Sequence, residues 1–467
     1  MHYDSASPQS ILDHAMIMLG KSLRDLYASA VDLNSGKGDL GQCVEKYHFE
    51  YAPNSKSEPD FPEAGVELKC TPMKRNKDGS MVSKERLVLN IIDYVKEAEE
   101  TFFTSSFWRK NKRLLLMFYL HENGKDVTDL IFKIIRLWEF PPEDLKIIKD
   151  DWDKIHGKIV SGHAHEVSEG DTLYLGACAK GSKGGANKRP QRNSGILADQ
   201  RAYSIKSRYI NTVILDSLSR PSMVDDVFLS DKQIDKIAKE AERIGSVVKS
   251  LDEYEKGETF EGLVERRFKP YYGKTIYQIE DSLGVILTDK VKALSNDVIH
   301  SILGVKAPKI KEFEKAGIQQ KSIRLEPNGN LRESMVFSQI KYDELAEEES
   351  WEDSVWYATL AQRFLFIVFR KDTSGDDKKA VLEKVFFWTM PTKDLAVAEK
   401  FWRDTRDKVR RGDFNHFVSM SDGMICHVRP KARNSKDLVP TKFGLQKKKG
   451  YWLNRDYVLG IVRDNMG

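Results

Sequence analysis

Two carboxylates and a lysine lie close together in the segment 59–69, which reads Pro-Asp-Phe-Pro-Glu-Ala-Gly-Val-Glu-Leu-Lys. Hydrolysis of a phosphodiester needs an in-line water and positive charge beside the phosphoryl oxygens, and a hard divalent cation supplies most of both. Mg²⁺ prefers oxygen ligands and keeps several waters. Asp60, Glu67 and the backbone carbonyl of Leu68 are therefore candidate Mg²⁺ ligands. Lys69 is a candidate for orienting or deprotonating the attacking water, or for offsetting charge in the transition state.

A strand and a turn must position these groups. Residues 66–69 alternate apolar and charged side chains, which predicts a β-strand with Glu67 and Lys69 on one face. Two prolines and a glycine lie between residues 59 and 65, so the chain can turn there and bring Asp60 back beside Glu67. The alternative is a surface strand whose Glu and Lys are only solvated, because this spacing alone is a weak signal.

The wider sequence resembles a known family. Pro-Asp followed by Glu-x-Lys is the signature of the PD-(D/E)XK nucleases, and residues 60–69 resemble the MutH-type subgroup and its GATC-cutting type II restriction endonucleases. The resemblance continues in order through residues 83–92, 104–107, 164–170 and 426–430. It implies a restriction-endonuclease-like α/β fold and Mg²⁺-dependent cleavage of duplex DNA at GATC, with 5′-phosphate ends. It also implies two further active-site residues: Glu45, and a lysine that is Lys112 or, as an alternative, Lys110.

Segments of the second half of the chain repeat segments of the first half at nearly constant spacing. The positions that match are Phe61, Ala64, Gly65 and Lys69 with Phe313, Ala316, Gly317 and Lys321. We read this as an internal duplication that gives two α/β domains of the same fold, each a central mixed sheet flanked by helices. The expected boundaries are 1–223 for a catalytic domain, 224–257 for a helical linker and 258–467 for a second domain.

The second copy differs at the positions that carry the chemistry. Gln319 stands where the first copy has Glu67, and Glu312 stands where it has Asp60. An amide cannot supply the anionic ligand that Mg²⁺ binding needs. We therefore expect the second copy to be catalytically degenerate and to bind a second GATC site as an effector. The simpler alternative is that it only adds affinity for DNA.

Two basic loops are candidates for DNA contacts, because lysine and arginine neutralise phosphates and can read base edges. Residues 180–192 form one loop and residues 429–434 the other, which resembles the Arg-Pro-Lys loop with which MutH-type enzymes address GATC. Taken singly, any of these side chains could simply be solvated. The candidate DNA-binding residues are Lys180, Lys183, Arg429, Lys431 and Arg433.

Composition narrows the classes of protein without selecting one. The 467 residues carry 75 Lys and Arg against 71 Asp and Glu, so the net charge of +4 does not by itself indicate a nucleic-acid partner. No apolar run reaches the roughly 20 residues of a membrane span. Four scattered cysteines argue against zinc or a disulfide framework and fit a bacterial cytoplasm, and no phosphate-binding loop for ATP is present.

A palindromic site cut in both strands also implies transient dimerisation on DNA or two sequential nicks. Two rival functions remain open at this point. One is a MutH-type mismatch-repair nicking enzyme, and the other is a non-catalytic DNA-binding protein.

Overall fold

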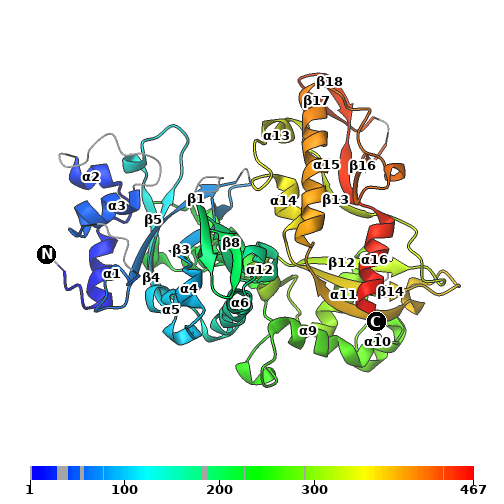
Figure 1. The fold of residues 1–467 in the computed structure, drawn as a ribbon, viewed down its shortest axis with the longest axis horizontal. Helices are drawn as coiled ribbons and strands as arrows, with labels where there is room; N and C mark the ends of the chain where they lie inside the picture. The colour runs from blue at the N-terminus through cyan, green and yellow to red at the C-terminus, as the bar shows by residue number, and fades with distance from the viewer. Residues whose placement is uncertain are drawn as a thin grey trace. The chain divides into compact units, whose positions relative to one another are not determined.

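The computed structural model describes residues 3–28, 40–52, 57–76, 78–180, 187–225, 227–288, 291–434 and 436–466. The chain forms two compact units. The first unit comprises Met1–Glu255 together with Lys306–Gly317, and the second comprises Lys256–Val305 and Ile318–Gly467. Both contain helices and several sheets with parallel and antiparallel neighbours, which confirms the expected mixed α/β architecture (Figure 1).

The first unit is built on a mixed four-stranded sheet of order β2-β1-β4-β5. The central strands β1 (Glu67–Arg75) and β4 (Arg113–Leu120) are parallel, and β2 (Met81–Ser83) and β5 (Phe132–Glu139) pair antiparallel at the edges. The run Leu114–Phe118 is completely buried in β4, as expected for a strand covered on both faces. The strand predicted from the alternation at 66–69 is thus the start of β1.

A second sheet of the first unit has the order β3-β9-β6, with β3 (Leu87–Ile91), β9 (Arg201–Ile205) and β6 (Leu175–Ala179) all antiparallel. A hairpin of β7 (Lys188–Gln191) and β8 (Ser194–Asp199) precedes β9. The helices of this unit are α1 (Pro8–Met16), α2 (Leu23–Tyr27), α3 (Leu40–Cys43), α4 (Tyr94–Glu97), α5 (Ser106–Asn111), α6 (Pro142–Val160), α7 (Ser207–Leu218), α8 (Asp231–Glu242) and α12 (Lys311–Ala316).

Among the described residues, the strand orders of the second unit match β1-β4-β5 and β3-β9-β6 of the first, without a counterpart of β2. Its first sheet is β12-β14-β15, in which β12 (Gln319–Leu325) and β14 (Phe364–Arg370) are parallel and β15 (Val381–Trp388) is antiparallel. Its other sheet is β13-β19-β16, formed by β13 (Met335–Gln339), β19 (Lys449–Leu453) and β16 (Cys426–Pro430), and a hairpin of β17 (Leu438–Thr441) and β18 (Gly444–Lys447) precedes β19. The helices are α9 (Phe260–Phe268), α10 (Ile276–Leu283), α11 (Val291–Leu303), α13 (Tyr342–Glu347), α14 (Val355–Leu360), α15 (Thr392–Arg410) and α16 (Arg455–Met466).

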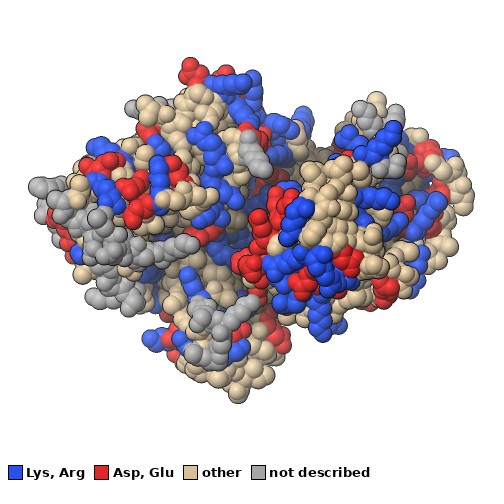
Figure 2. Space-filling view, turned by 90° about the horizontal axis from the view of Figure 1, so that it is seen from above, with Lys and Arg blue, Asp and Glu red and all other residues tan. Residues whose placement is uncertain are grey.

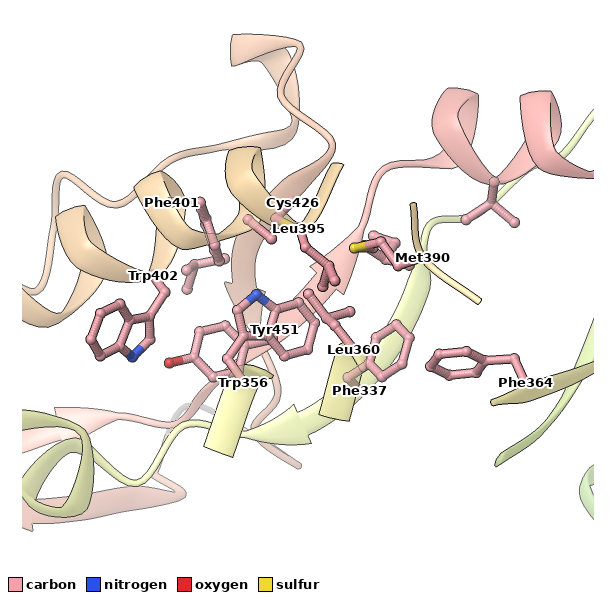
Figure 3. Packing of buried hydrophobic residues seen from close by; sticks show 14 of the residues in the cluster. Phe337, Trp356, Leu360, Phe364, Met390, Leu395, Phe401, Trp402, Cys426 and Tyr451 are labelled. Atoms are coloured by element: carbon pink, nitrogen blue, oxygen red, sulfur yellow. The ribbon is translucent and has the colours of Figure 1, made fainter. Parts of the chain in front are cut away.

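One aromatic core joins the two sheets of the second unit to helices α14 and α15. The indole of Trp356 lies flat against the ring of Tyr451, with centroids 4.6 Å apart (Figure 3). Phe337 meets Trp356 edge to face, and Trp402 of α15 is fully buried. Such large rings remove much apolar area from water, and this burial is the main source of the unit's stability.

The segment 306–317 packs with the first unit although it lies in the second half of the sequence. Strand β11 (Lys309–Ile310) pairs in parallel with β10 (Ile244–Gly245). The ammonium of Lys315 is buried and forms an ion pair with buried Asp144 of α6, which also accepts a hydrogen bond from the hydroxyl of Tyr209 at 2.9 Å. The segment is therefore anchored by charge as well as by strand pairing.

None of the helices formed by the described residues combines the length and the apolar character that a membrane crossing requires.

Candidate active site

Residues 61–66 form a tight turn that returns the chain to the start of β1. The amide of Phe61 donates to the carbonyl of Val66 at 2.9 Å, and the amide of Val66 donates back to the carbonyl of Phe61 at 3.2 Å. Gly65 has a φ of +62°, a left-handed conformation that glycine adopts without a steric penalty. The turn places Asp60 beside Glu67, as the prolines and the glycine predicted.

The two carboxylates are in contact through the backbone. The amide of Asp60 donates to Glu67 Oε2 at 3.2 Å, and the amide of Leu68 donates to Asp60 Oδ2 at 2.9 Å. Glu67 is almost completely buried. Burial, followed by the negative charge of Glu67, raises the pKa of Asp60 to about 6. The site thus holds two carboxylates close enough for the charge of Glu67 to disfavour ionisation of Asp60.

Two lysines reach the same carboxylate. Lys69 Nζ, two residues along β1, lies 2.7 Å from Glu67 Oε1, and Lys110 Nζ of α5 lies 3.5 Å from the same atom. Lys112, at the end of α5, has a different place: a Cβ built on Gly65 would lie 3.2 Å from Lys112 Cε. The structure therefore brings Lys69 and Lys110 to Glu67 and packs Lys112 against the turn.

Glu45 lies near the carboxylate pair, on the π-helical turn Val44–His48. Burial and then the charges of Asp60 and Glu67 raise the pKa of Glu45 to about 7. Tyr51 was not anticipated from the sequence. Its hydroxyl is buried with no hydrogen-bond partner among the described residues, and burial and then the charge of Asp60 raise its pKa far above the ordinary value.

The donor set fits a divalent cation of the Mg²⁺ type. Burial, and then the charge of neighbouring carboxylates, raises the pKa values of Asp60 and Glu45, and a bound cation would stabilise their ionised forms. The part of the chain that the structure describes contains no group of three or more His, Cys, Asp or Glu side chains placed to hold a metal. Two carboxylates and a backbone carbonyl are sufficient for Mg²⁺, because this ion keeps several of its waters.

The candidate DNA-binding residues of the first unit lie around β6. Lys180 directly follows this strand, is half-buried, and donates its backbone amide to the carbonyl of Gln200 at 2.8 Å. Lys183 lies outside the described residues. On the face shown in Figure 2, lysine and arginine side chains gather in several groups with acidic side chains among them.

The second unit carries Arg429, Lys431 and Arg433 at and after the end of β16, and all three are exposed. The guanidinium of Arg429 lies 4.9 Å from the ring centroid of Trp452, and Lys431 Nζ donates to the carbonyl of Phe337. Arg433 donates its backbone amide to Asp437 Oδ2 at 3.1 Å. The side chains of Arg429 and Lys431 therefore lie beside Trp452 and Phe337 of the β13-β19-β16 sheet.

The positions that match the catalytic candidates have a different chemistry in the second unit. Gln319 and Lys321 lie in β12 in register with Phe364 and Phe366, as Glu67 and Lys69 of β1 lie in register with Leu114 and Leu116. Glu312 belongs to the first unit, where its carboxylate accepts hydrogen bonds from the amides of Val247 at 3.0 Å and Val248 at 3.2 Å.

Known proteins match both the site and the whole chain. The family model described as "DNA mismatch repair enzyme MutH" matches residues 49–151, which include Asp60, Glu67, Lys69 and Lys110. The type II restriction enzyme Sau3AI of Staphylococcus aureus is 33% identical to this chain, and the match covers 98% of each protein. The DNA mismatch repair proteins MutH of Serratia proteamaculans and Shewanella baltica (strain OS185) are 26% and 25% identical over 44% of this chain, which is 91% and 92% of their own length. A nearly whole MutH protein is therefore matched by less than half of this chain.

Proposed function

Because this chain belongs to the MutH-like family of type II restriction endonucleases, we propose that it cleaves double-stranded DNA at GATC by Mg²⁺-dependent hydrolysis and leaves 5′-phosphate ends. The observation that carries the proposal is the joined arrangement of Asp60, Glu67 and Lys69 at the turn before β1. The GATC site and the choice of Mg²⁺ are supported by the resemblance of residues 60–69 to GATC-cutting enzymes.

Asp60, Glu67 and the carbonyl of Leu68 would hold the cation, and Glu45 would add negative charge behind them. The chemistry that Mg²⁺ supplies when bound is positive charge beside the scissile phosphodiester. Lys69 would orient the attacking water from the same strand face and offset charge in the transition state. The further active-site lysine is either Lys112 or Lys110. We assign this role to Lys110, because its ammonium is the one that reaches Glu67.

The first experiment is incubation of the purified full chain with Mg²⁺ and a plasmid of known sequence, followed by mapping of the product ends. Glu67→Gln should abolish cleavage, because it removes the anionic ligand and keeps the shape of the side chain. The matched control is Glu139→Gln at an exposed glutamate of β5 that pairs with Arg113, which should leave cleavage intact.

The products separate the rival functions. Double-strand cuts at each GATC support the restriction activity. Nicks at GATC without double-strand cuts would instead support a MutH-type nicking enzyme. Binding of GATC duplexes without any cleavage would support a non-catalytic DNA-binding protein and overturn the proposal.

We also propose that the chain contains its nuclease fold twice, with residues 1–223 as the catalytic domain, 224–257 as a linker and 258–467 as the degenerate copy. The matching strand orders β1-β4-β5 with β12-β14-β15, and β3-β9-β6 with β13-β19-β16, support the duplication. The coverage of MutH proteins by less than half of this chain supports it as well.

The second domain, in this proposal, binds another GATC site and promotes cleavage by the first. Lys180 and Lys183 would contact DNA from the first domain, and Arg429, Lys431 and Arg433 from the second. Cleavage of plasmids with one and with two GATC sites tests the effector role, with a short GATC duplex added in trans. Faster cleavage with two sites or with added duplex supports activation, whereas equal rates with tighter binding support the simpler role of added affinity.

Two chains are proposed to meet transiently on DNA, because a palindromic site presents two equivalent phosphodiesters to one active site per chain. Sedimentation of the chain with a GATC duplex in Ca²⁺, compared with the free chain, measures this directly. One chain per duplex at saturation would favour two sequential nicks.

A further inference from the structure

Lys321 of the second unit is a half-buried cation without a carboxylate partner among the described residues. Its ammonium lies 3.2 Å from the carbonyl oxygen of Val336 and 4.3 Å from the centroid of the Phe337 ring. The matching lysine of the first unit, Lys69, instead forms an ion pair with Glu67. The replacement of Glu67 by Gln319 has thus left the second lysine without its charge partner.

A second lysine lies beside it. Lys431 donates to the carbonyl of Phe337, the neighbour of the residue that Lys321 contacts. Burial, and then the positive charge of Lys431, lowers the pKa of Lys321. The charge of Lys431 thus disfavours the ammonium form of Lys321, and an anion near both lysines would offset this effect.

The backbone is shaped to hold Lys431 in this place. A Cβ built on Gly450 of β19 would lie 2.9 Å from Lys431 Cδ and 3.0 Å from the carbonyl oxygen of Ser338, so only glycine leaves room for the lysine chain. In the first unit the matching position of the ladder is Ala202, which pairs with Cys178 as Gly450 pairs with Arg429. The glycine that leaves room for the lysine chain in the second unit thus has an alanine as its counterpart in the first.

The acid that matches Asp60 has other partners. Glu312, which matches Asp60, is bonded to the amides of Val247 and Val248. Leu360, a buried apolar residue at the end of α14, matches Lys110. The chemistry that remains at this position of the second unit is cationic, whereas that of the first unit is mainly anionic.

We propose that Lys321 and Lys431 form a phosphate-binding site, in which the degenerate copy of the active site holds one backbone phosphate of duplex DNA without a divalent cation. This inference rests on the proposed function, since it assigns to the second unit the mode by which it grips DNA. A lysine ammonium is a point charge suited to phosphate, and each phosphate contact releases condensed counterions from DNA.

The test is the binding of a fluorescent GATC duplex to the full chain in EDTA, measured by anisotropy over a range of salt concentrations. Lys321→Gln should weaken binding about tenfold at 0.1 M salt and reduce the slope of log K against log salt by about one. Lys321→Arg should restore both the affinity and the slope. The matched control is Lys393→Gln at an exposed lysine of α15, which should change neither.

Two results would overturn the proposal. One is an unchanged affinity and slope in Lys321→Gln. The other is a lower unfolding midpoint with an unchanged slope, because then Lys321 only braces strand β13. Cleavage of GATC plasmid by the wild-type chain in Mg²⁺ is measured in parallel, so that loss of the proposed enzymatic function is distinguished from loss of this site.

Discussion

Glu67 and Gln319 begin the corresponding strands β1 and β12, yet the ionisable groups around them differ. Glu67 has both carboxylates and two lysines nearby, whereas the groups described near Gln319 are lysines. Around Glu67 stand Asp60 and Glu45, which together have two raised pKa values. Around Gln319 stand Lys321 and Lys431, and the pKa of Lys321 is lowered. The amide at Gln319 in place of a carboxylate, and the bonding of Glu312 to other groups, are the differences from which we infer that the two sites favour different ions.

The two units have the same strand register but different polar side chains at the matching positions. The second unit keeps the parallel pairing of its first two strands, the lysine in register, and a hairpin before the last sheet strand. Its core is built from buried apolar residues of both sheets and of helices α14 and α15 (Figure 3). The two units therefore share their strand pairing and differ at a few polar positions.

Substitutions at Glu67 and Gln319 should have the largest effects. Glu67→Gln should lower the cleavage rate by at least about 10⁴-fold, an increase in barrier of about 5 kcal/mol. Gln319→Glu should not create a second nuclease, because Leu360 and Glu312 do not supply the remaining groups. It should instead weaken DNA binding in EDTA, since the new carboxylate would pair with Lys321.

Single-turnover cleavage and duplex binding measure the two effects. Cleavage by a Glu67→Gln, Gln319→Glu double variant would contradict the assignment of catalysis to the first unit.

The next largest effect concerns the segment 306–317. Lys315→Met should lower the free energy of unfolding by about 3 to 5 kcal/mol, because it leaves Asp144 buried without its counter-ion. Lys309, whose ammonium is more exposed and pairs with Glu240, provides the matched control, and Lys309→Met should have a small effect. Urea unfolding followed by circular dichroism measures the free energy of unfolding of both variants. Equal decreases in Lys315→Met and Lys309→Met would mean that the Lys315–Asp144 pair does not anchor the segment.

Each unit has a buried histidine with a lowered pKa, but the two histidines differ in their hydrogen bonding. His427 of β16 is fully buried, and neither ring nitrogen has a hydrogen-bond partner among the described residues. Burial, and then the charge of Arg429, lowers its pKa from 6.5 to about 4. His48 of the first unit has a similarly lowered pKa of about 4 but is hydrogen-bonded, to the hydroxyl of Tyr27 at 2.8 Å.

The native state thus binds a proton at His427 less tightly than the unfolded chain does. The contribution of neutral His427 to the free energy of unfolding is complete above pH 6.5. It falls by about 3 kcal/mol as the pH falls toward 4. His427→Leu should remove this share of the acid sensitivity and keep or raise stability at neutral pH, because it deletes unpaired polar groups. Unfolding midpoints between pH 7 and 4 test this, with exposed His416→Gln as control. A Leu variant that keeps the full wild-type pH dependence would refute it.

The smallest expected effect is on the cleavage rate, when either of the two lysines near the turn 61–66 is replaced. Lys110→Ala should slow cleavage about 30-fold, or about 2 kcal/mol, because it removes a charged contact to Glu67. Lys112→Ala should leave the rate close to wild type, since its chain packs on Gly65. The reverse order of rates would return the auxiliary role to Lys112.

The sequence predicted the parts of the site that depend on local pattern. Alternation placed Glu67 and Lys69 on one strand, and the prolines and Gly65 placed Asp60 beside them. The apolar runs at 114–119 and 364–369 are the strands β4 and β14. These predictions succeeded because each depends on residues adjacent in the chain.

Contacts between distant segments could not be predicted in this way. Whether Lys110 or Lys112 reaches Glu67 depends on how α5 is placed in the folded unit, which the spacing of the two lysines in the sequence does not show. Tyr51 has no spacing that would mark it, since its place is fixed only when its ring packs on Phe61. The return of residues 306–317 to the first unit depends on a buried ion pair whose members are 171 positions apart.

That return has a consequence for synthesis on the ribosome. The chain leaves the first unit after residue 255, comes back at 306 and leaves again after 317, so the first unit is complete only when residue 317 has emerged. A nascent or prematurely terminated chain that ends near residue 257 would lack α12 and with it the ammonium of Lys315, the counter-ion of Asp144. Such a fragment would carry Asp60, Glu67 and Lys69 without the segment that completes their unit, and we expect it to be less stable than the full chain.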